Sequence, residues 1–256
     1  MKLEGKVAIV TGSSRGVGKE TASGIARGGS AVVVNYRQSA AEAATVVHEI
    51  EQLGARVLCV QADVSQEADC LRLVSETVAA FGGVDILVNN AATTNFLPFA
   101  DLDKLTDDHW DRIFQTNVKG AFYCIRAAKP HLERSSEGGE IVNVSSVAGL
   151  IGNGSSMAYC ASKAALISLT VSCARALAPN IRVNSVAPGF IADHWTQAGL
   201  GDSYEQAKQG HEQRAVLGKV CGPADVAAAI LGLIQGTDLV TGQTIVCDGG
   251  MMIGPR

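Results

Sequence analysis

The stretch that decides the fold is Lys6-Val-Ala-Ile-Val-Thr11-Gly12-Ser-Ser-Arg15-Gly16-Val-Gly18. Its apolar first half predicts a short strand that is buried on both faces. Glycines then allow the backbone to turn sharply before a helical pattern begins. Because the N–H groups and dipole at a helix N-terminus attract phosphate, this order predicts a dinucleotide site, with an ordinary glycine turn as the alternative. The residues expected to hold the pyrophosphate are Gly12, Ser14, Arg15, Gly16, Val17 and Gly18.

Strand and helix patterns alternate along the rest of the chain. Further strands are expected at 31–35, 56–61, 84–89, 140–144, 181–186 and 244–247, and helices at 40–53, 66–81, 107–132, 158–178 and 223–234. Such alternation predicts an α/β Rossmann fold, with a doubly wound, mostly parallel seven-stranded sheet flanked by helices on both faces. Since no linker interrupts the pattern, we expect residues 1–256 to form a single dinucleotide-binding domain.

Composition excludes several other classes of protein. The 256 residues carry a net charge of −4 without a Lys/Arg cluster, which argues against nucleic acid or an anionic membrane surface as a partner. The N-terminus lacks the pattern of a signal peptide, and we expect no bilayer-spanning run and a cytoplasmic location. Seven scattered cysteines without a Cys-x-x-Cys pair predict core thiols and no metal site.

The end of the second predicted strand bears on the choice of dinucleotide. An acidic residue there would bind the adenosine ribose and repel a 2′-phosphate, but this chain has Tyr36 and Arg37. Arg37 and Arg15 can grip a 2′-phosphate, so we predict NADP(H) over NAD(H); two solvated surface arginines are the alternative. After the third and fourth strands, Asp63-Val64 suits the adenine and Asn89-Asn-Ala91 leaves room for a ribose, although each could be an ordinary strand cap.

A possible acid/base pair lies in the second half of the chain. Tyr159 and Lys163 are four residues apart, so on a helix they share one face. An ammonium beside a phenol favours the phenolate, and we therefore expect Lys163 to lower the pKa of Tyr159. Ser146 follows a strand and can fold back over the phenol, whereas Asn117 is an interior polar residue that needs partners. Alone, Tyr-x-x-x-Lys is a weak motif, and a half-buried Tyr beside a surface Lys is the alternative.

In their sequence order, these motifs resemble the short-chain dehydrogenase/reductase family over essentially the whole length. Val144-Ser-Ser-Val-Ala-Gly149 and the tail Thr241 to Gly250 are most similar to 3-oxoacyl-[acyl-carrier-protein] reductases. The resemblance implies hydride transfer between a nicotinamide and a ketone or secondary alcohol. It also implies that Tyr159 exchanges the proton, that Lys163 lowers its pKa and holds the nicotinamide ribose, that Ser146 orients the carbonyl and that Asn117 positions a water. By the same resemblance, the cofactor contacts Pro188, Gly189 and Ile191, and the chain forms a homotetramer.

The chain departs from the family's pattern at several points. Ala92 stands where the family has glycine, and Asp193 where it has a threonine, whose hydroxyl contact could pass to Thr196. A carrier protein is acidic, yet the stretch from Lys129 to Glu140 mixes both charges, which weakens the expectation of a carrier-protein partner. A sugar or polyol dehydrogenase is therefore an alternative, as is a non-catalytic NADP(H)-binding regulator.

The long polar segment at about 192–219 follows a strand end, where insertions often form lids over substrates. We expect it to bound the substrate through Trp195, Tyr204 and His211.

Overall fold

The computed structural model describes residues 1–254 and has a seven-stranded sheet in the order β3-β2-β1-β4-β5-β6-β7. Every neighbouring pair of these strands is parallel, which confirms the predicted doubly wound sheet. The strands are β1 (Val7–Val10), β2 (Ala31–Tyr36), β3 (Val57–Gln61), β4 (Ile86–Asn89), β5 (Gly139–Val144), β6 (Ile181–Pro188) and β7 (Thr244–Cys247).

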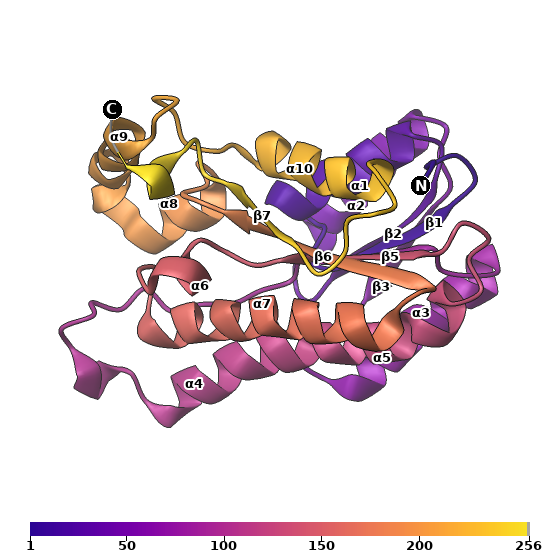
Figure 1. The fold of residues 1–256 in the computed structure, drawn as a ribbon, viewed down its shortest axis with the longest axis horizontal. Coiled ribbons are helices and arrows are strands. Elements are labelled where there is room, and N and C mark those ends of the chain that lie inside the picture. Colours follow the sequence, from indigo (N-terminus) through magenta and orange to yellow (C-terminus); the bar gives the residue numbers. More distant parts are fainter. Residues whose placement is uncertain (255–256) are drawn as a thin grey trace.

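Helices cover both faces of this sheet (Figure 1). One face carries α1 (Gly16–Arg27), α2 (Ala40–Gln52) and α10 (Pro223–Gln235), and the other carries α3 (Glu67–Phe81), α5 (Ala121–Leu132) and α7 (Met157–Leu177). Successive side chains of a strand point to opposite faces, so a strand buried on both sides feeds two cores. In β1, Val10 belongs to the core under α1 and α10, while its neighbour Ile9 belongs to the core under α3, α5 and α7.

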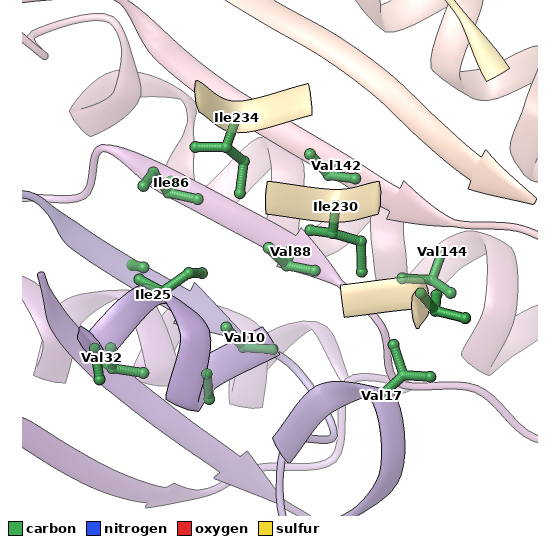
Figure 2. Packing of buried hydrophobic residues seen from close by; sticks show 14 of the residues in the cluster. Val10, Val17, Ile25, Val32, Ile86, Val88, Val142, Val144, Ile230 and Ile234 are labelled. Atoms are coloured by element: carbon green, nitrogen blue, oxygen red, sulfur yellow. The ribbon is translucent and has the colours of Figure 1, made fainter. Parts of the chain in front are cut away.

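The first of these cores fixes the helix that follows the glycine turn (Figure 2). Ile25 of α1 and Ile230 of α10 are fully buried together with Val10 and Val88. Burying one such side chain contributes about 1.5–3 kcal/mol. The position of the α1 N-terminus relative to the sheet is therefore set by apolar packing.

The sheet reverses its winding between β1 and β4, because the chain runs out to β3 and then returns to the other side of β1. The two strand ends are tied together: Thr11 N donates to Val88 O at 3.0 Å, and Asn90 Nδ2 donates to Thr11 O at 2.9 Å. Ligands of doubly wound sheets bind at the carboxyl ends of the strands beside such a reversal. The fold thus places a binding site where the predicted residues converge.

The helix expected at 107–132 is interrupted. It consists of α4 (Asp107–Phe114), a π-helical segment (Gln115–Gly120) and α5. Three further helices lie in segments without a predicted element: α6 (Ala148–Ile151), α8 (His194–Leu200) and α9 (Tyr204–Arg214), with α8 and α9 together beside the C-terminus (Figure 1). Short 3₁₀ turns occupy Leu102–Lys104, Gly201–Ser203 and Met251–Ile253.

One expectation about membranes needs correction. Within residues 1–254, α7 is long and apolar enough, by length and composition, to cross a bilayer. The apolar surface of α7 is instead packed inside the protein, since Leu166, Cys173 and Leu177 are buried. We therefore assign α7 to the core of the fold.

Candidate active site

A cavity of about 520 Å³ opens at the carboxyl ends of β1 and β4. It brings together residues that are far apart in sequence: the glycine turn, the ends of β2 and β3, the start of α7 and the loop after β6. Of the predicted site residues, those that line it are Gly12, Ser14, Arg15, Gly16, Val17, Tyr36, Arg37, Asp63, Val64, Ala91, Ser146, Tyr159, Lys163, Pro188, Gly189 and Ile191.

The glycine turn has the geometry of a phosphate cradle. Gly12 and Gly16 have φ of +62° and +56°, which side-chain-bearing residues rarely adopt, and α1 starts at Gly16. At Gly18 a Cβ would lie 2.5 Å from Gly12 O and 2.6 Å from Asn90 Nδ2, so only glycine fits between the turn and the β4 loop. Asn35 Oδ1 accepts from Gly12 N at 3.0 Å and fixes the turn from beneath. A pyrophosphate fits this arrangement.

The end of β2 presents cationic and aromatic groups to the cavity. Asn35 is buried there, and its amide donates to Ala62 O at 3.0 Å. Tyr36 and Arg37 line the cavity, and Arg37 Nη1 lies 3.7 Å from Asp63 Oδ2. About half of the Arg37 side chain is exposed, so it can reach an anion. Arg37 at this strand end and Arg15 in the glycine turn therefore present two guanidinium groups to the cavity, and the strand end itself carries no carboxylate.

The pair on α7 faces the same cavity. Ser156 caps the helix and accepts from Tyr159 N at 3.2 Å, which places Tyr159 in the first turn and Lys163 one turn later. Lys163 Nζ lies 5.5 Å from the centre of the Tyr159 ring and donates to Val144 O at 2.8 Å. Both side chains are buried, and Ser146 lies within hydrogen-bonding reach of the phenol.

Protonation at this pair differs from the sequence expectation. Burial raises the pKa of Tyr159 above its ordinary value, although a hydrogen bond with Ser146 opposes the rise. Burial also lowers the pKa of Lys163 to about 7. Low polarity disfavours the charged form of each group, and this effect outweighs the expected stabilisation of a phenolate by the lysine. The net shift of the Tyr159 pKa is therefore upward, opposite to the expected direction, and the phenol is protonated at neutral pH.

Three predicted residues lie outside the cavity wall. Gly18 packs against Gly12, as described above. Asn89 is buried and donates to Asn143 Oδ1 at 2.9 Å, and its neighbours Asn90 and Ala91 line the cavity instead. Ala91 therefore lines the cavity as expected, whereas Asn90 lines it in place of Asn89.

Asn117, the third of these residues, is buried in the π-helical segment and connects two parts of the site. Its Oδ1 accepts from Thr93 N at 2.8 Å, while its Nδ2 donates to Thr93 O and to Ser162 Oγ, both at 3.0 Å. Single-turn π-helices occur frequently at functional sites. Here the segment positions an amide that ties the loop after β4 to α7.

Asp193 has a local structural role. It caps α8, and its Oδ1 accepts from Thr196 N at 2.9 Å and from Thr196 Oγ1 at 3.0 Å. A Cβ at Gly16 would lie 3.3 Å from Asp193 Oδ2, so the carboxylate also borders the glycine turn. The hydroxyl expected to take over a cofactor contact, that of Thr196, is engaged with this carboxylate.

The segment at 192–219 brings aromatic side chains over the cavity. The ring centre of Trp195 on α8 lies 6.3 Å from that of Tyr159 and 6.2 Å from that of Phe96. Phe190 stacks on His211 of α9 at 4.8 Å. Trp195, Tyr204 and His211 were expected to bound a substrate, and of these Trp195 and His211 line the cavity whereas Tyr204 packs against Phe190. Phe96 has no local sequence signal, because only tertiary contact brings its loop to α8. Among residues 1–254, no three His, Cys, Asp or Glu side chains are grouped to hold a metal ion.

Comparison with known proteins gives the class. Residues 12–252 match the family described as enoyl-(acyl carrier protein) reductase. A crystal structure of a short-chain dehydrogenase/reductase from Burkholderia xenovorans superposes with a TM-score of 0.90 at 35% identity, over 97% of this chain and 98% of that one. The chain belongs to the short-chain dehydrogenase/reductase family, which binds nicotinamide cofactors and acts on small molecules.

Three curated relatives resemble this chain over nearly their whole lengths. Ketoacyl reductase 2 of the granaticin polyketide synthase from Streptomyces violaceoruber is 42% identical over 96% of each chain. A 3-oxoacyl-[acyl-carrier-protein] reductase of Staphylococcus aureus is 39% identical over 96% of this chain and 98% of its own. L-rhamnose 1-dehydrogenase (NAD(P)(+)) of a Sphingomonas strain is 37% identical over 98% of both.

Proposed function

We propose that this enzyme is an NADP(H)-dependent reductase of 3-oxoacyl thioesters. The observation that carries the proposal is that the Tyr159 hydroxyl, Ser146 and Lys163 share one cavity with the glycine turn. NADP(H), when bound, supplies or accepts the hydride. Tyr159 gives its phenolic proton to the substrate oxygen, and Ser146 orients that carbonyl by a hydrogen bond. Lys163 holds the nicotinamide ribose hydroxyls.

The preference for NADP(H) is supported by the cations at the end of β2. Arg15 and Arg37 both line the cavity there, and charge-assisted bonds from guanidinium to phosphate are strong and often bidentate. Replacing both by alanine should raise the KM for NADPH by about 10²–10⁴-fold, at roughly 1.5–3 kcal/mol for each of the two lost contacts, and leave that for NADH nearly unchanged. A wild-type enzyme that prefers NADH would contradict this part of the proposal.

Reduction itself is tested by following NADPH absorbance with acetoacetyl thioesters. Tyr159→Phe should bind NADPH as the wild type does, because the hydroxyl is not needed to hold the nucleotide, and should lose about 10²–10⁴-fold in turnover. Calorimetry of NADPH binding provides the control. Wild-type protein that binds NADPH but reduces no ketone in a broad panel would instead support the alternative of a non-catalytic regulator.

A sugar or polyol dehydrogenase is the second candidate, since L-rhamnose 1-dehydrogenase (NAD(P)(+)) is similar over 98% of this chain. Oxidation of a panel of aldoses and polyols with NADP⁺ distinguishes the two. The relatives also suggest a carrier-protein partner. Lys129 is one cation expected to dock such an acidic protein, but its Nζ lies 2.8 Å from Glu133 Oε1 and its charge is partly neutralised. We therefore propose that the enzyme reduces 3-oxoacyl thioesters whether or not the acyl group is attached to a carrier protein.

We also infer a cytoplasmic homotetramer whose subunits meet through helix faces at 107–132 and 158–178, as the family resemblance implies. Light scattering coupled to gel filtration tests the number of subunits. A monomer at micromolar concentration would contradict the inference.

A further inference from the structure

Three aromatic side chains from separate elements meet beside the reacting groups. Phe96 comes from the loop after β4, Tyr159 from α7 and Trp195 from α8, and all three line the cavity. Trp195 contacts both of the others, with its ring tilted by 57° to Tyr159 and by 70°, edge-on, to Phe96. We call these three residues the aromatic cluster.

The cluster is held in place by unusually close packing. At Gly199 of α8, a Cβ would lie 2.0 Å from the Phe96 ring, so the ring rests directly on the helix backbone. On the other side, the Gly154 loop lies against the Tyr159 ring at ordinary van der Waals distance, since a Cβ at Gly154 would lie 3.6 Å from Tyr159 Cδ1. Because Phe96 packs so closely on α8, it forms with Trp195 a defined aromatic wall beside Tyr159.

Polar groups beside this wall are already bonded to one another. Thr94 Oγ1 and Ser155 Oγ lie 2.6 Å apart, and Leu97 N donates to Ser155 O at 2.8 Å. Asn153 lines the cavity too, but it is exposed at the rim. A polyhydroxylated substrate needs several free donors and acceptors, and leaving them unmade is costly.

The charged side chains that line the cavity are likewise bonded to other groups or lie away from the aromatic cluster. Lys163 donates to Val144 O, Asp193 caps α8, and Arg15 and Arg37 lie with the glycine turn and the end of β2. His194 and His211 also line the cavity, and burial together with Arg214 lowers the pKa of His211, so the His211 imidazole is neutral at pH 7. A carboxylate or phosphate on the part of the substrate near the carbonyl would find no free lysine or arginine at the aromatic cluster.

We propose that this enzyme selects 3-oxoacyl thioesters whose acyl group carries an aromatic ring, and that Trp195 and Phe96 determine this specificity. The inference rests on the proposed function, since it places the ketone at Tyr159. Trp195 lies close to the place where the ketone would bond to the Tyr159 hydroxyl, since the two ring centres are 6.3 Å apart, and the proposal places the acyl substituent against this ring. Aromatic rings gain from edge-to-face and offset contacts beyond the area that they bury.

The test compares two N-acetylcysteamine thioesters with equal numbers of carbon atoms and an unconjugated ketone: 3-oxo-5-phenylpentanoyl and 3-oxoundecanoyl. Wild-type enzyme should favour the phenyl substrate in kcat/KM by about 3–10-fold, which corresponds to one well-made aromatic contact. Trp195→Leu and Phe96→Leu keep apolar bulk but remove the ring, and each should bring this ratio close to one. Trp110→Leu is the matched control, because Trp110 stacks on Phe114 of α4 and does not line the cavity.

The outcomes separate this inference from the proposed function. Equal or better reduction of the straight-chain substrate by the wild type, or a ratio that the two leucine variants do not change, would overturn the aromatic specificity while leaving the reductase intact. If neither thioester is reduced, the proposed function fails, and calorimetry of the same pair then decides the inference. Tighter binding of the phenyl compound that is lost in Trp195→Leu supports it, and equal binding overturns it.

Discussion

Replacing Asn117 by alanine should destabilise the protein and disorganise its active site at the same time. The side chain makes three hydrogen bonds from a position that is 2% exposed. The bond to Ser162 is fully buried and contributes about 1–1.5 kcal/mol, whereas each of the two bonds to Thr93 contributes roughly 0.5–1.5 kcal/mol because water can partly replace them. The expected loss in the free energy of unfolding is therefore about 2–4 kcal/mol.

Urea unfolding followed by circular dichroism measures this loss, and a double-mutant cycle with Ser162→Ala isolates the buried bond. Ser162 Oγ also donates to Tyr159 O at 2.7 Å, so the cycle reports on a contact that reaches the catalytic helix. The coupling energy should be about 1 kcal/mol. A destabilisation below about 1 kcal/mol, or strictly additive single effects, would refute the view that Asn117 ties the loop after β4 to α7.

Three further predictions follow from burial and packing. Lys163→Met should be inactive, yet urea unfolding should show it to be about 1–3 kcal/mol more stable than the wild type at pH 7. Unfolded Lys163 binds a proton up to its ordinary pKa of 10.5, whereas the folded side chain binds one only up to about 7. The stability of the wild type therefore rises with pH across that window, and the difference between the two proteins should narrow toward pH 10. Gly18→Ala should lower the free energy of unfolding by about 1–3 kcal/mol and weaken NADPH binding in calorimetry, because there is no room for its Cβ. Gly210→Ala in α9 is the control: its Cβ would meet nothing within 4 Å, so this variant should gain about 0.5–1 kcal/mol of stability. Cys221 and Cys247, with sulfur atoms 3.8 Å apart, should be joined by diamide and released by dithiothreitol, and peptide mapping that finds both thiols free after diamide treatment would contradict this.

The sheet could be predicted from the sequence because its strands are short, apolar and β-branched, and because glycine or polar residues end them. For β7 the predicted and observed ranges coincide at 244–247. The helices α8 and α9 could not be predicted in this way. The α9 sequence from Tyr204 to Arg214 has no buried residue and no apolar stripe, so its composition is typical of a loop.

At the site, sequence reasoning succeeded where a motif fixes the backbone and failed where the outcome depends on packing. The glycine turn needs glycine for steric reasons that are local, and every residue from Ser14 to Val17 lines the cavity as expected. In contrast, the spacing of Tyr159 and Lys163 shows that they are neighbours but not how deeply they are buried. Burial decides the direction of both pKa shifts, and it depends on the whole fold.

The burial that stabilises the sheet also sets the pKa values of the two groups on α7. Because α7 is packed into the core, the pKa of Tyr159 is raised above its ordinary value and that of Lys163 is lowered to about 7. A buried amine that must lose its proton on folding lowers stability, so Lys163 is a cost that packing alone would not retain. In the proposed reaction, that cost retains a lysine beside Tyr159 whose charge responds to small changes in its surroundings. A protein that only bound the nucleotide would have no need of a phenol and an amine buried in this way, and the pair therefore favours catalysis over binding alone.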